Sequence, residues 1–257
     1  MPSALPLTAY IRTLNEARMI AEVIAAARQV ADEVIVVDSG SSDETVALAE
    51  AAGARVISQS WLGNGFQKRV AEEHASNNWL LDLDADEIVS DALAEGIREV
   101  FASGPAHSAY AMTLVWKSPG RAPYAQSFTG VRAKLYDRRV HRQPEHKVWD
   151  QLPDLNAKAL PRVKGGLIHH IYEDLEQLVA KQNRGSSNRA RNGKQRSATQ
   201  LALRVLFAFP VYFLRQYLGK GGWRAGVHGF GLSAVLALSR WLRDFKQFEE
   251  RTKSPKP

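Results

Sequence analysis

The first hundred residues alternate between two hydrophobic patterns, one typical of strands and one typical of helices. Continuous apolar runs at residues 7–11 and 34–37 predict buried β-strands. Between these runs, apolar side chains recur at helical spacing at Met19, Ile20, Val23, Ile24 and Ala27. Strands joined by helices of this length favour right-handed crossovers and a parallel sheet covered on both faces. The pattern therefore predicts an α/β nucleotide-binding fold.

The same alternation continues through the next segment. Ser41 and Glu44 have the spacing of a capping box at the start of a helix, which Gly53 can end. Beyond it, a strand, a helix and a further strand are predicted at residues 55–58, 67–76 and 79–84. We expect residues 1–104 to form the half of a catalytic domain that binds the nucleotide.

The pattern changes after this half. Residues 109–116 and 131–136 predict two strands separated by a loop that contains glycine and proline. We expect residues 105–172 to form the acceptor-side half of the same domain, which then spans residues 1–172.

Two apolar stretches, residues 201–218 and 226–242, follow a long helix that is expected to begin near Glu173. Neither is a clean membrane span, because arginines and Pro210 interrupt the first, and the second is short, rich in glycine and bounded by arginines. Such stretches suit helices that lie in a membrane interface. Residues 173–257 are therefore expected to be a C-terminal amphipathic helical, membrane-associating region.

Composition and charge support this division. The chain has 257 residues, of which 45% are hydrophobic, and no cysteine, which favours a reducing cytoplasmic location and excludes disulfides. Residues 177–243 contain twelve basic residues and no acidic one, and residues 244–257 add four basic and three acidic residues, so the net charge of +7 leaves an excess of six acids in residues 1–176. An acidic body thus precedes a basic, apolar part. No secretory signal is expected at the N-terminus.

Three aspartates, Asp82, Asp84 and Asp86, alternate at the end of the last strand predicted in the nucleotide half. The two-residue period of a strand can place their carboxylates on one side, at the sheet edge where ligands bind in open α/β folds. Carboxylate oxygens at this edge suit a Mg²⁺ or Mn²⁺ ion as ligands. Such an ion is usually bound by one or two carboxylates together with substrate phosphates. The alternative is an acidic turn, because Asp is common in turns and at helix N-termini.

The second predicted strand ends in another polar segment, residues 38–43. The Asp38 carboxylate can accept hydrogen bonds from a base or ribose, and small residues such as Gly40 let a ligand approach the backbone at the start of a helix. The alternative is an ordinary N-capped turn. Together with the acidic segment, Asp38 predicts a nucleotide diphosphate site. Neither a dinucleotide-binding fingerprint nor a P-loop occurs in the sequence.

These segments resemble glycosyltransferase family 2, the inverting enzymes of GT-A fold, and within that family the bacterial lipopolysaccharide core glycosyltransferases. The resemblance is strong at residues 13–16, 31–45, 65–68 and 83–87, and weaker at residues 148–150, from Glu173 onward and at residues 222–226. It implies a GT-A-type nucleotide-binding fold with a mostly parallel central sheet.

The resemblance also implies roles for individual residues. The residue matching Asp38 contacts the nucleotide base, the pair matching Asp84 and Asp86 engages ribose and metal diphosphate, and Lys68 lies where a basic residue helps to hold the diphosphate. Asp84 and Asp86 are accordingly the expected ligands of Mg²⁺ or Mn²⁺. The expected nucleotide-sugar site comprises Thr13, Asn15, Glu16, Asp38, Gly40, Lys68 and Asp84.

Inverting transfer needs a carboxylate that takes the proton from the acceptor hydroxyl, and such general-base help contributes about 10²- to 10⁴-fold to the rate. By resemblance the base lies in residues 148–150, where relatives usually have Val-His-Glu and this chain has Val-Trp-Asp. Asp150 keeps the carboxylate but is one methylene shorter, and Glu145 is the nearby alternative. A solvated loop acid before Pro153 is the non-catalytic interpretation of Asp150.

Other side chains have two interpretations. His169 and His170 follow a strand-like run and would face opposite sides of a strand. One of them can reach the metal or the leaving diphosphate, although a structural role is favoured. Trp116, Tyr124 and Trp149 can stack on a sugar or anchor the core and loops.

The sequence thus predicts a metal-dependent inverting glycosyltransferase that moves a hexose or heptose from a nucleotide-sugar donor to a lipid-linked saccharide acceptor, with lipopolysaccharide core as the expected acceptor. We expect it on the cytoplasmic, inner face of the cell membrane, peripherally bound to an anionic membrane surface. One alternative is a sugar-nucleotide nucleotidyltransferase, which needs a Gly-rich basic loop that this chain lacks. The other is a non-enzymatic module that binds membrane or nucleic acid, but without a nucleic-acid-binding motif no nucleic acid is expected as a partner.

Overall fold

The computed structural model describes residues 5–124 and 127–253, which divide into two compact units. By packing, the first unit comprises Met1–Val115 and Gly130–His169, and the second comprises Trp116–Thr129 and His170–Pro257. The functional boundary expected between residues 172 and 173 stays a prediction.

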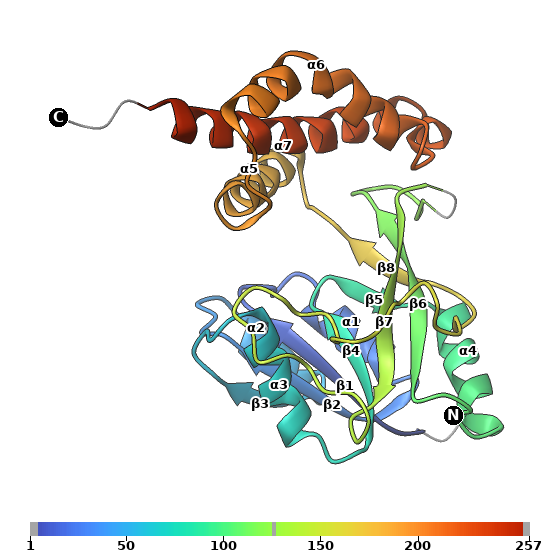
Figure 1. Cartoon of the computed structure of the whole chain (residues 1–257). Helices are drawn as coiled ribbons and strands as arrows, with labels where there is room; N and C mark the ends of the chain where they lie inside the picture. The colour runs from blue at the N-terminus through green and yellow to red at the C-terminus, as the bar shows by residue number, and fades with distance from the viewer. Residues whose placement is uncertain (1–4, 125–126, 254–257) are drawn as a thin grey trace. The chain divides into compact units, whose positions relative to one another are not determined.

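The first unit is built on one eight-stranded sheet (Figure 1). Its strands are β1 (Leu5–Thr13), β2 (Ala31–Asp38), β3 (Arg55–Ser58), β4 (Trp79–Asp84), β5 (Glu87–Val89), β6 (Ala109–Lys117), β7 (Thr129–Asp137) and β8 (Leu167–His170). Its helices are α1 (Ile20–Ala27), α2 (Thr45–Ala51), α3 (Asn64–His74) and α4 (Asp91–Ala102). The predicted alternation of strands and helices up to β4 is confirmed.

The sheet is mixed. Its strand order is β3-β2-β1-β4-β7-β6-β8-β5, and the first four strands pair in parallel. β7 pairs antiparallel with β4, and β5 pairs antiparallel with β8. The prediction of an α/β fold is therefore confirmed. The expected parallel arrangement holds only for the half of the sheet formed by β3, β2, β1 and β4. Parallel neighbours need a crossover connection, and within the described residues α4 is the one helix that separates the strands after β4.

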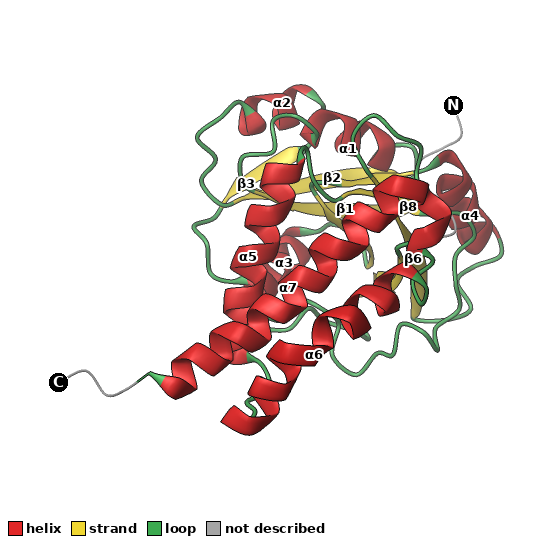
Figure 2. Ribbon diagram, turned by 90° about the horizontal axis from the view of Figure 1, so that it is seen from above, coloured by secondary structure: helices red, strands yellow, loops and turns green. Residues whose placement is uncertain are grey.

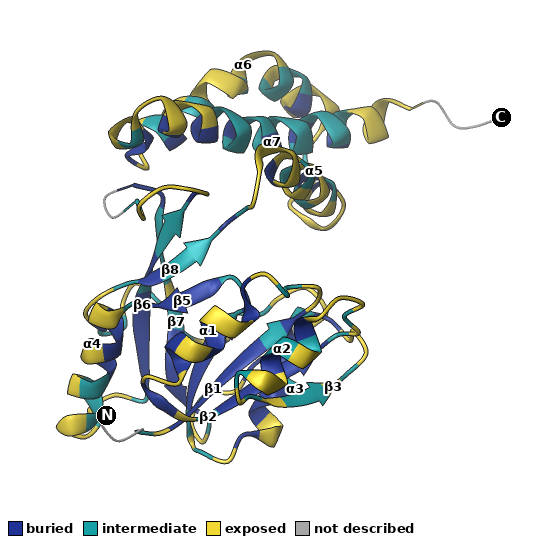
Figure 3. Cartoon of the chain, turned by 180° about the vertical axis from the view of Figure 1, so that it is seen from behind, coloured by how far each residue is buried: buried dark blue, intermediate teal, exposed yellow. Residues whose placement is uncertain are grey.

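The central strands are buried on both faces (Figure 3). On one face, Leu7, Ala9 and Ile11 of β1 pack in the same cluster as the apolar stripe of α1. On the other face, Tyr10 packs in the cluster of Ala71 from α3. This two-residue period fixes the register of β1, because a shift by one residue would exchange the two faces.

Helix α2 begins without the predicted capping box. Glu44 is the N-cap residue, and its side chain makes no capping hydrogen bond. The Ser41 hydroxyl instead donates to Asp38 Oδ1 at 2.5 Å, and Asp43 Oδ1 accepts the Thr45 N–H at 3.0 Å. The capping-box prediction is wrong because the loop after β2 engages Ser41 before the helix starts.

The second unit contains the C-terminal helices α5 (Leu175–Asn192), α6 (Ala198–Tyr217) and α7 (Gly226–Thr252), with a 3₁₀ helix at Gly222–Ala225. The predicted apolar stretches form α6 and the first part of α7, which lie side by side (Figure 2). Buried Asp244 of α7 links them, accepting hydrogen bonds from Tyr212 Oη at 2.5 Å and Arg204 Nε at 3.0 Å. Within residues 5–124 and 127–253, no single helix has the length and apolar character to cross a membrane, whereas α6 and Gly222–Thr252 together do but are bent by 68°.

Candidate active site

The loops that follow β1 and β2 form one connected rim at the carboxyl ends of these strands. The Asn15 N–H donates to Ser41 Oγ at 2.8 Å, and Asn15 Oδ1 accepts the Ser42 N–H at 2.8 Å. The Glu16 N–H donates to Thr45 Oγ1 at 2.8 Å. Asn15 has a φ of 54°, in the left-handed region that asparagine tolerates better than most residues. The structure therefore brings two predicted donor-site residues, Asn15 and Glu16, to the loop of Asp38.

Asp38 is buried and turned onto its own loop. Its Oδ2 accepts the N–H groups of Gly40 and Ser41, each at 2.9 Å, and its Oδ1 accepts the Ser41 hydroxyl. This arrangement is the capped turn that the sequence left open as an alternative. A carboxylate offers about four acceptor positions, so one remains for a ligand. In register beside Asp38 lies Thr13, whose buried Oγ1 has no hydrogen-bond partner within the described part of the chain.

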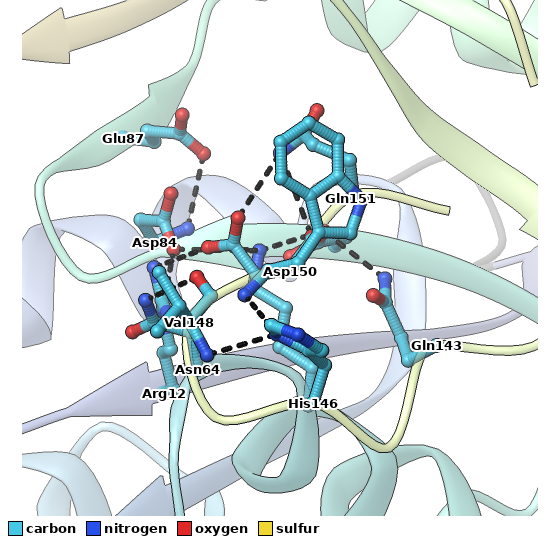
Figure 4. Close-up of polar contacts among 12 residues, drawn as sticks. Arg12, Asn64, Asp84, Glu87, Gln143, His146, Val148, Asp150 and Gln151 are labelled. Atoms are coloured by element: carbon cyan, nitrogen blue, oxygen red, sulfur yellow. Dashed lines mark hydrogen bonds and ion pairs between the residues drawn. The ribbon is translucent and has the colours of Figure 1, made fainter. Parts of the chain in front are cut away.

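Arg12 joins two of the predicted site carboxylates (Figure 4). It lies near the end of β1, in register with Asp84 of β4, and its Nε donates to Asp84 Oδ1 at 3.1 Å. Nη1 donates to Asn64 Oδ1, at the start of α3, at 2.8 Å. Nη2 lies 2.8 Å from Asp150 Oδ2, in the loop after β7. One guanidinium thus binds a strand, a helix and a loop.

Lys68 lies behind this group, with its side chain 1% exposed. Its Nζ donates to Asp82 Oδ2 at 2.8 Å. The same atom lies 3.6 Å from Asp84 Oδ1 and 3.9 Å from Asp150 Oδ2. Lys68 therefore holds acidic side chains of the site together, and its expected contact with a diphosphate stays a prediction.

Lys134 of β7 is a second buried cation. Its Nζ donates to Glu87 Oε2 at 2.7 Å and lies 3.5 Å from Asp84 Oδ2. Asp82 Oδ1 is 3.8 Å away. Glu87 also accepts the Asp84 N–H at 3.0 Å, which closes the turn between β4 and β5. Because a buried charge is costly unless it is paired, these contacts fix the acidic segment in one conformation.

The surrounding charges set the protonation of this segment. Burial alone would raise the pKa of the Asp84 carboxyl, but Lys134, Lys68 and Arg12, together with His169, hold it well below its usual range. Burial raises the pKa of Glu87 above its ordinary value, even though Lys134 acts in the opposite direction. Burial would lower the pKa of Lys134, but the adjacent carboxylates raise it. Asp84 is therefore ionised and Lys134 protonated at neutral pH.

Asp86 and His169 form a more open pair at the ends of β4 and β8. Strands β5 and β8 pair so that Glu87 lies opposite His169. The His169 ring therefore reaches the acidic turn, where its Nε2 lies 3.2 Å from Asp86 Oδ2. The two side chains are 18% and 21% exposed. Burial would lower the pKa of His169, but the hydrogen bond to Asp86 raises it. Its Nδ1 is buried and lacks a hydrogen-bond partner among the residues that the structure describes.

This pair fits two neighbouring ligands of a divalent ion. Two adjacent ligands of an octahedral ion, each at about 2.1 Å, lie about 3 Å apart, and the Asp86 and His169 donor atoms are 3.2 Å apart. Among residues 5–124 and 127–253, no group of three or more histidine or acidic side chains is placed to hold an ion. Waters and diphosphate oxygens would complete the shell, as Mg²⁺ commonly requires. Asp84, the other expected ligand, is instead turned toward Arg12 and the two lysines.

The loop that carries Asp150 is docked on the start of α3. The N–H groups of Asn64 and Gly65 donate to carbonyl oxygens of this loop, each at 2.9 Å. A Cβ at Gly65 would overlap further carbonyl oxygens of the loop, so only glycine permits this contact. His146 Nδ1 accepts the Trp149 N–H at 2.8 Å and tightens the turn before Asp150. The backbone on which Asp150 sits is thus held from two sides.

Four candidate residues remain: Glu145, Trp149, Trp116 and Tyr124. Glu145 is exposed, as is Trp149, which is 56% exposed. In the second unit, Trp116 stacks on Phe128 with ring centroids 5.7 Å apart, and Tyr124 meets the same ring edge-on. Trp116 and Tyr124 therefore act as core anchors, the second interpretation that the sequence allowed.

Comparisons with known proteins identify the class of protein. Residues 8–155, more than half of the chain, match the model of the family described as Glycosyl transferase family 2. The chain belongs to this family and is a glycosyltransferase. The alternatives of a nucleotidyltransferase and of a non-enzymatic binding module are thereby set aside.

Individual relatives extend the match to the whole chain. A protein of Rickettsia felis named as an uncharacterized glycosyltransferase is 33% identical, with 96% of this chain and 91% of the relative covered. The lipopolysaccharide core biosynthesis glycosyltransferase LpsC of Rhizobium meliloti is 27% identical, with 98% of this chain and 96% of that protein covered. A solved structure of glucosyl-3-phosphoglycerate synthase from Mycobacterium tuberculosis is 24% identical in sequence, and the similarity covers 44% of each chain. Its TM-score is 0.34, which is too low to support conclusions about the site.

Proposed function

We propose that this glycosyltransferase moves a sugar, with inversion, from a nucleotide-sugar donor to a hydroxyl of a lipid-linked saccharide. The observation that carries the proposal is the contact of Arg12 with both Asp84 and Asp150, at 3.1 and 2.8 Å, because it unites a predicted donor residue and the predicted base in one site. Membership of the family supports the transfer reaction, and the name of the Rhizobium meliloti relative supports lipopolysaccharide core as the acceptor.

The carboxylates of the site divide the tasks of this reaction. Asp150 takes the proton of the acceptor hydroxyl while that oxygen bonds to the anomeric carbon. The bond from the anomeric carbon to the diphosphate oxygen breaks, and the electron pair leaves with the nucleoside diphosphate. Asp38 and Asp84 orient the nucleoside. The rim around Asp38 carries the expected donor-site residues Thr13, Asn15, Glu16 and Gly40, whereas Lys68 lies behind Asp84.

Asp86 and His169 are the proposed protein ligands of a Mg²⁺ or Mn²⁺ ion, and the 3.2 Å between their donor atoms supports this choice. Such an ion neutralises the negative charge that grows on the leaving diphosphate. The chain itself keeps the ligands in place, because Glu87 closes the turn beside Asp86 and β8 fixes the position of His169. The expected part of Asp84 in metal binding stays a prediction.

We expect Asp86→Asn to raise the Mn²⁺ concentration needed for half-maximal activity by at least about tenfold, since even the loss of a supporting residue around a metal typically costs about 10- to 100-fold in affinity. The measurement is release of nucleoside diphosphate from a panel of nucleotide sugars, titrated with Mn²⁺ and with Mg²⁺. The control is Asp91→Asn, an exposed acid at the start of α4. Transfer by the unaltered protein in the presence of a chelator would refute the metal dependence.

The second unit supports attachment to a membrane surface. Helix α6 carries an outward apolar stripe at helical spacing, with side chains that are 49–71% exposed: Leu203, Leu206, Phe207, Val211 and Leu214, followed by Leu218 just after the helix. Beyond it, Trp223 is 51% exposed, and its neighbours Lys220 and Arg224 are exposed cations. Exposed apolar side chains bordered by cations suit the interface of an anionic bilayer. We place α6 in the plane of the inner leaflet of the cell membrane, on the cytoplasmic side.

We expect the double replacement Leu206→Ser and Phe207→Ser to weaken vesicle binding at least about tenfold, because full burial of one such side chain is worth about 1.5–3 kcal/mol. Flotation with vesicles of phosphatidylethanolamine and phosphatidylglycerol measures the bound fraction, and phosphatidylcholine vesicles separate the contribution of charge. The matched control is Val140→Ser, a 61% exposed apolar residue of the first unit. Equal flotation of the double variant and the control would count against the α6 surface.

A further inference from the structure

The guanidinium of Arg12 has three different partners on three elements. Nε, Nη1 and Nη2 approach Asp84, Asn64 and Asp150 at 3.1, 2.8 and 2.8 Å. The Arg12 side chain is 21% exposed, and the two carboxylates are 29% and 22% exposed. These contacts are therefore partly shielded from water, where charge-assisted hydrogen bonds are stronger than at an open surface.

The partners differ in how firmly the fold holds them. Asp84 ends a central strand, whereas Asp150 lies in an irregular loop. Main-chain hydrogen bonds to α3 dock the backbone of that loop, but they leave the torsions of the Asp150 side chain unset. The planar, rigid fork of an arginine can fix those torsions, because each nitrogen donates along a set direction.

The two oxygens of Asp150 are used differently. Oδ2 takes the ion pair with Arg12 and lies 3.9 Å from Lys68 Nζ. Oδ1 has a long contact of 3.4 Å with the Gln151 amide. Oδ1 is thus the oxygen that a substrate hydroxyl can reach with least displacement of protein groups.

We propose that Arg12 is a positioning residue, which holds Asp150 Oδ2 so that Oδ1 faces the site where Asp84 holds the donor. This inference rests on the proposed function, because it takes Asp150 as the base. The proton of the acceptor hydroxyl moves to Oδ1 as the new glycosidic bond forms and the bond to the diphosphate oxygen breaks. Arg12 itself gains and loses no proton in this step.

The first test compares Arg12→Ala and Arg12→Lys with the unaltered enzyme. A displacement of about 1 Å at a reacting group costs about 10²-fold, so we expect Arg12→Ala to lower kcat by about 10- to 100-fold. Lysine restores the charge, but its three N–H donors leave from one nitrogen and cannot span acceptors on three elements, so Arg12→Lys should recover less than half of the kcat of the unaltered enzyme. Binding of nucleoside diphosphate should change much less than kcat, because Lys68 and Lys134 still hold Asp84. Unchanged kcat in Arg12→Ala, or full activity in Arg12→Lys, overturns the proposal.

The second test asks whether Arg12 acts through Asp150. Arg12→Ala is combined with Asp150→Asn, and single-turnover rates are measured at enzyme concentrations above the substrate. Residues that act as one unit are not additive, so Arg12→Ala should cost little further in the Asp150→Asn background. An equal loss in both backgrounds assigns Arg12 a role independent of Asp150 and overturns the proposal.

The two tests also separate this inference from the proposed function. If Asp150→Asn alone keeps full activity, the base assignment fails whatever Arg12 does. If Asp150→Asn is impaired and Arg12→Ala is not, the base assignment stands and the positioning role fails. Thermal unfolding of each variant, compared with the unaltered protein, identifies a loss of activity that comes from loss of the fold.

Discussion

Replacing Asp150 with asparagine is expected to lower kcat for sugar transfer by about 10²- to 10⁴-fold, the usual contribution of a general base. Asparagine has nearly the same shape, and its amide oxygen can still accept a hydrogen bond from Arg12 Nη2, which lies 2.8 Å from Asp150 Oδ2. What is lost is the negative oxygen that takes the proton. The dissociation constant for nucleoside diphosphate should therefore stay within about threefold of its value in the unaltered enzyme, while kcat falls.

The control for this prediction is Glu145→Gln on the same loop. Glu145 is exposed, whereas Asp150 is held beside Asp84 through Arg12. Steady-state rates with a saturating donor and a range of acceptor concentrations separate kcat from KM for both variants. A large loss in Glu145→Gln with little change in Asp150→Asn would move the base to Glu145.

Replacing Lys134 with methionine is expected to destabilise the first unit by about 3–5 kcal/mol, the typical effect of removing one partner from a buried ion pair. Methionine keeps most of the volume, so the loss reports charge rather than a cavity. Without the ammonium group, Glu87, which is 1% exposed, loses its 2.7 Å partner and must either carry an uncompensated buried charge or take up a proton, and Asp84 loses a cation at 3.5 Å. Urea unfolding, monitored by circular dichroism, measures the difference in the free energy of unfolding between the variant and the unaltered protein.

A matched surface lysine provides the comparison. Lys164 lies 2.7 Å from Glu99, but its side chain is 76% exposed, so Lys164→Met should change stability by less than about 1 kcal/mol. Adding Glu87→Gln to Lys134→Met should recover part of the loss, because the second change removes the uncompensated charge. Similar stability of Lys134→Met and Lys164→Met would show that the network around Lys134 contributes little.

Much of the fold could be predicted because the responsible signals are local. The apolar runs of β1 and β2 and the stripe of α1 are continuous in sequence, and each lies where the pattern placed it. The antiparallel half could not be placed in the same way, because a short strand such as β5 gives no periodic signal and its partner β8 lies about eighty residues further along the chain.

The sequence indicated the carboxylates of the candidate site and Lys68, but it did not indicate Arg12 or Lys134. Asp84 and Asp86 stand out because acids cluster at the end of an apolar strand. Arg12 gave no comparable signal, because a single arginine at the end of a strand is usually interpreted as a solvent-exposed residue. Its partner Asp150 is also 138 positions away in the sequence. Lys134 did carry a clue: a lysine next to an apolar run in a predicted strand is buried only when carboxylates surround it.

Lys68 illustrates a different limit. The resemblance to glycosyltransferase family 2 implied that it helps to hold the diphosphate, which stays a prediction, and in the structure its Nζ donates to Asp82 Oδ2 at 2.8 Å. Residue type and position along the chain were informative, whereas the direction of this side chain from α3 depended on Asp82, which lies on β4. The position of the His169 side chain also depended on a distant segment, because the pairing of β5 with β8 brings it to Asp86.

The two sides of the proposed reaction rest on different kinds of scaffold. Asp84 ends β4, Asp86 lies in the short turn between β4 and β5, and His169 lies on β8, so the donor side is carried by the sheet. The proposed base lies on a loop that is docked against α3 through Gly65 and main-chain hydrogen bonds. Loops accept substitution and insertion more readily than strands do. A change of acceptor can therefore be sought by exchanging residues of this loop while the donor machinery is left intact, which makes the loop the natural place to redesign the enzyme.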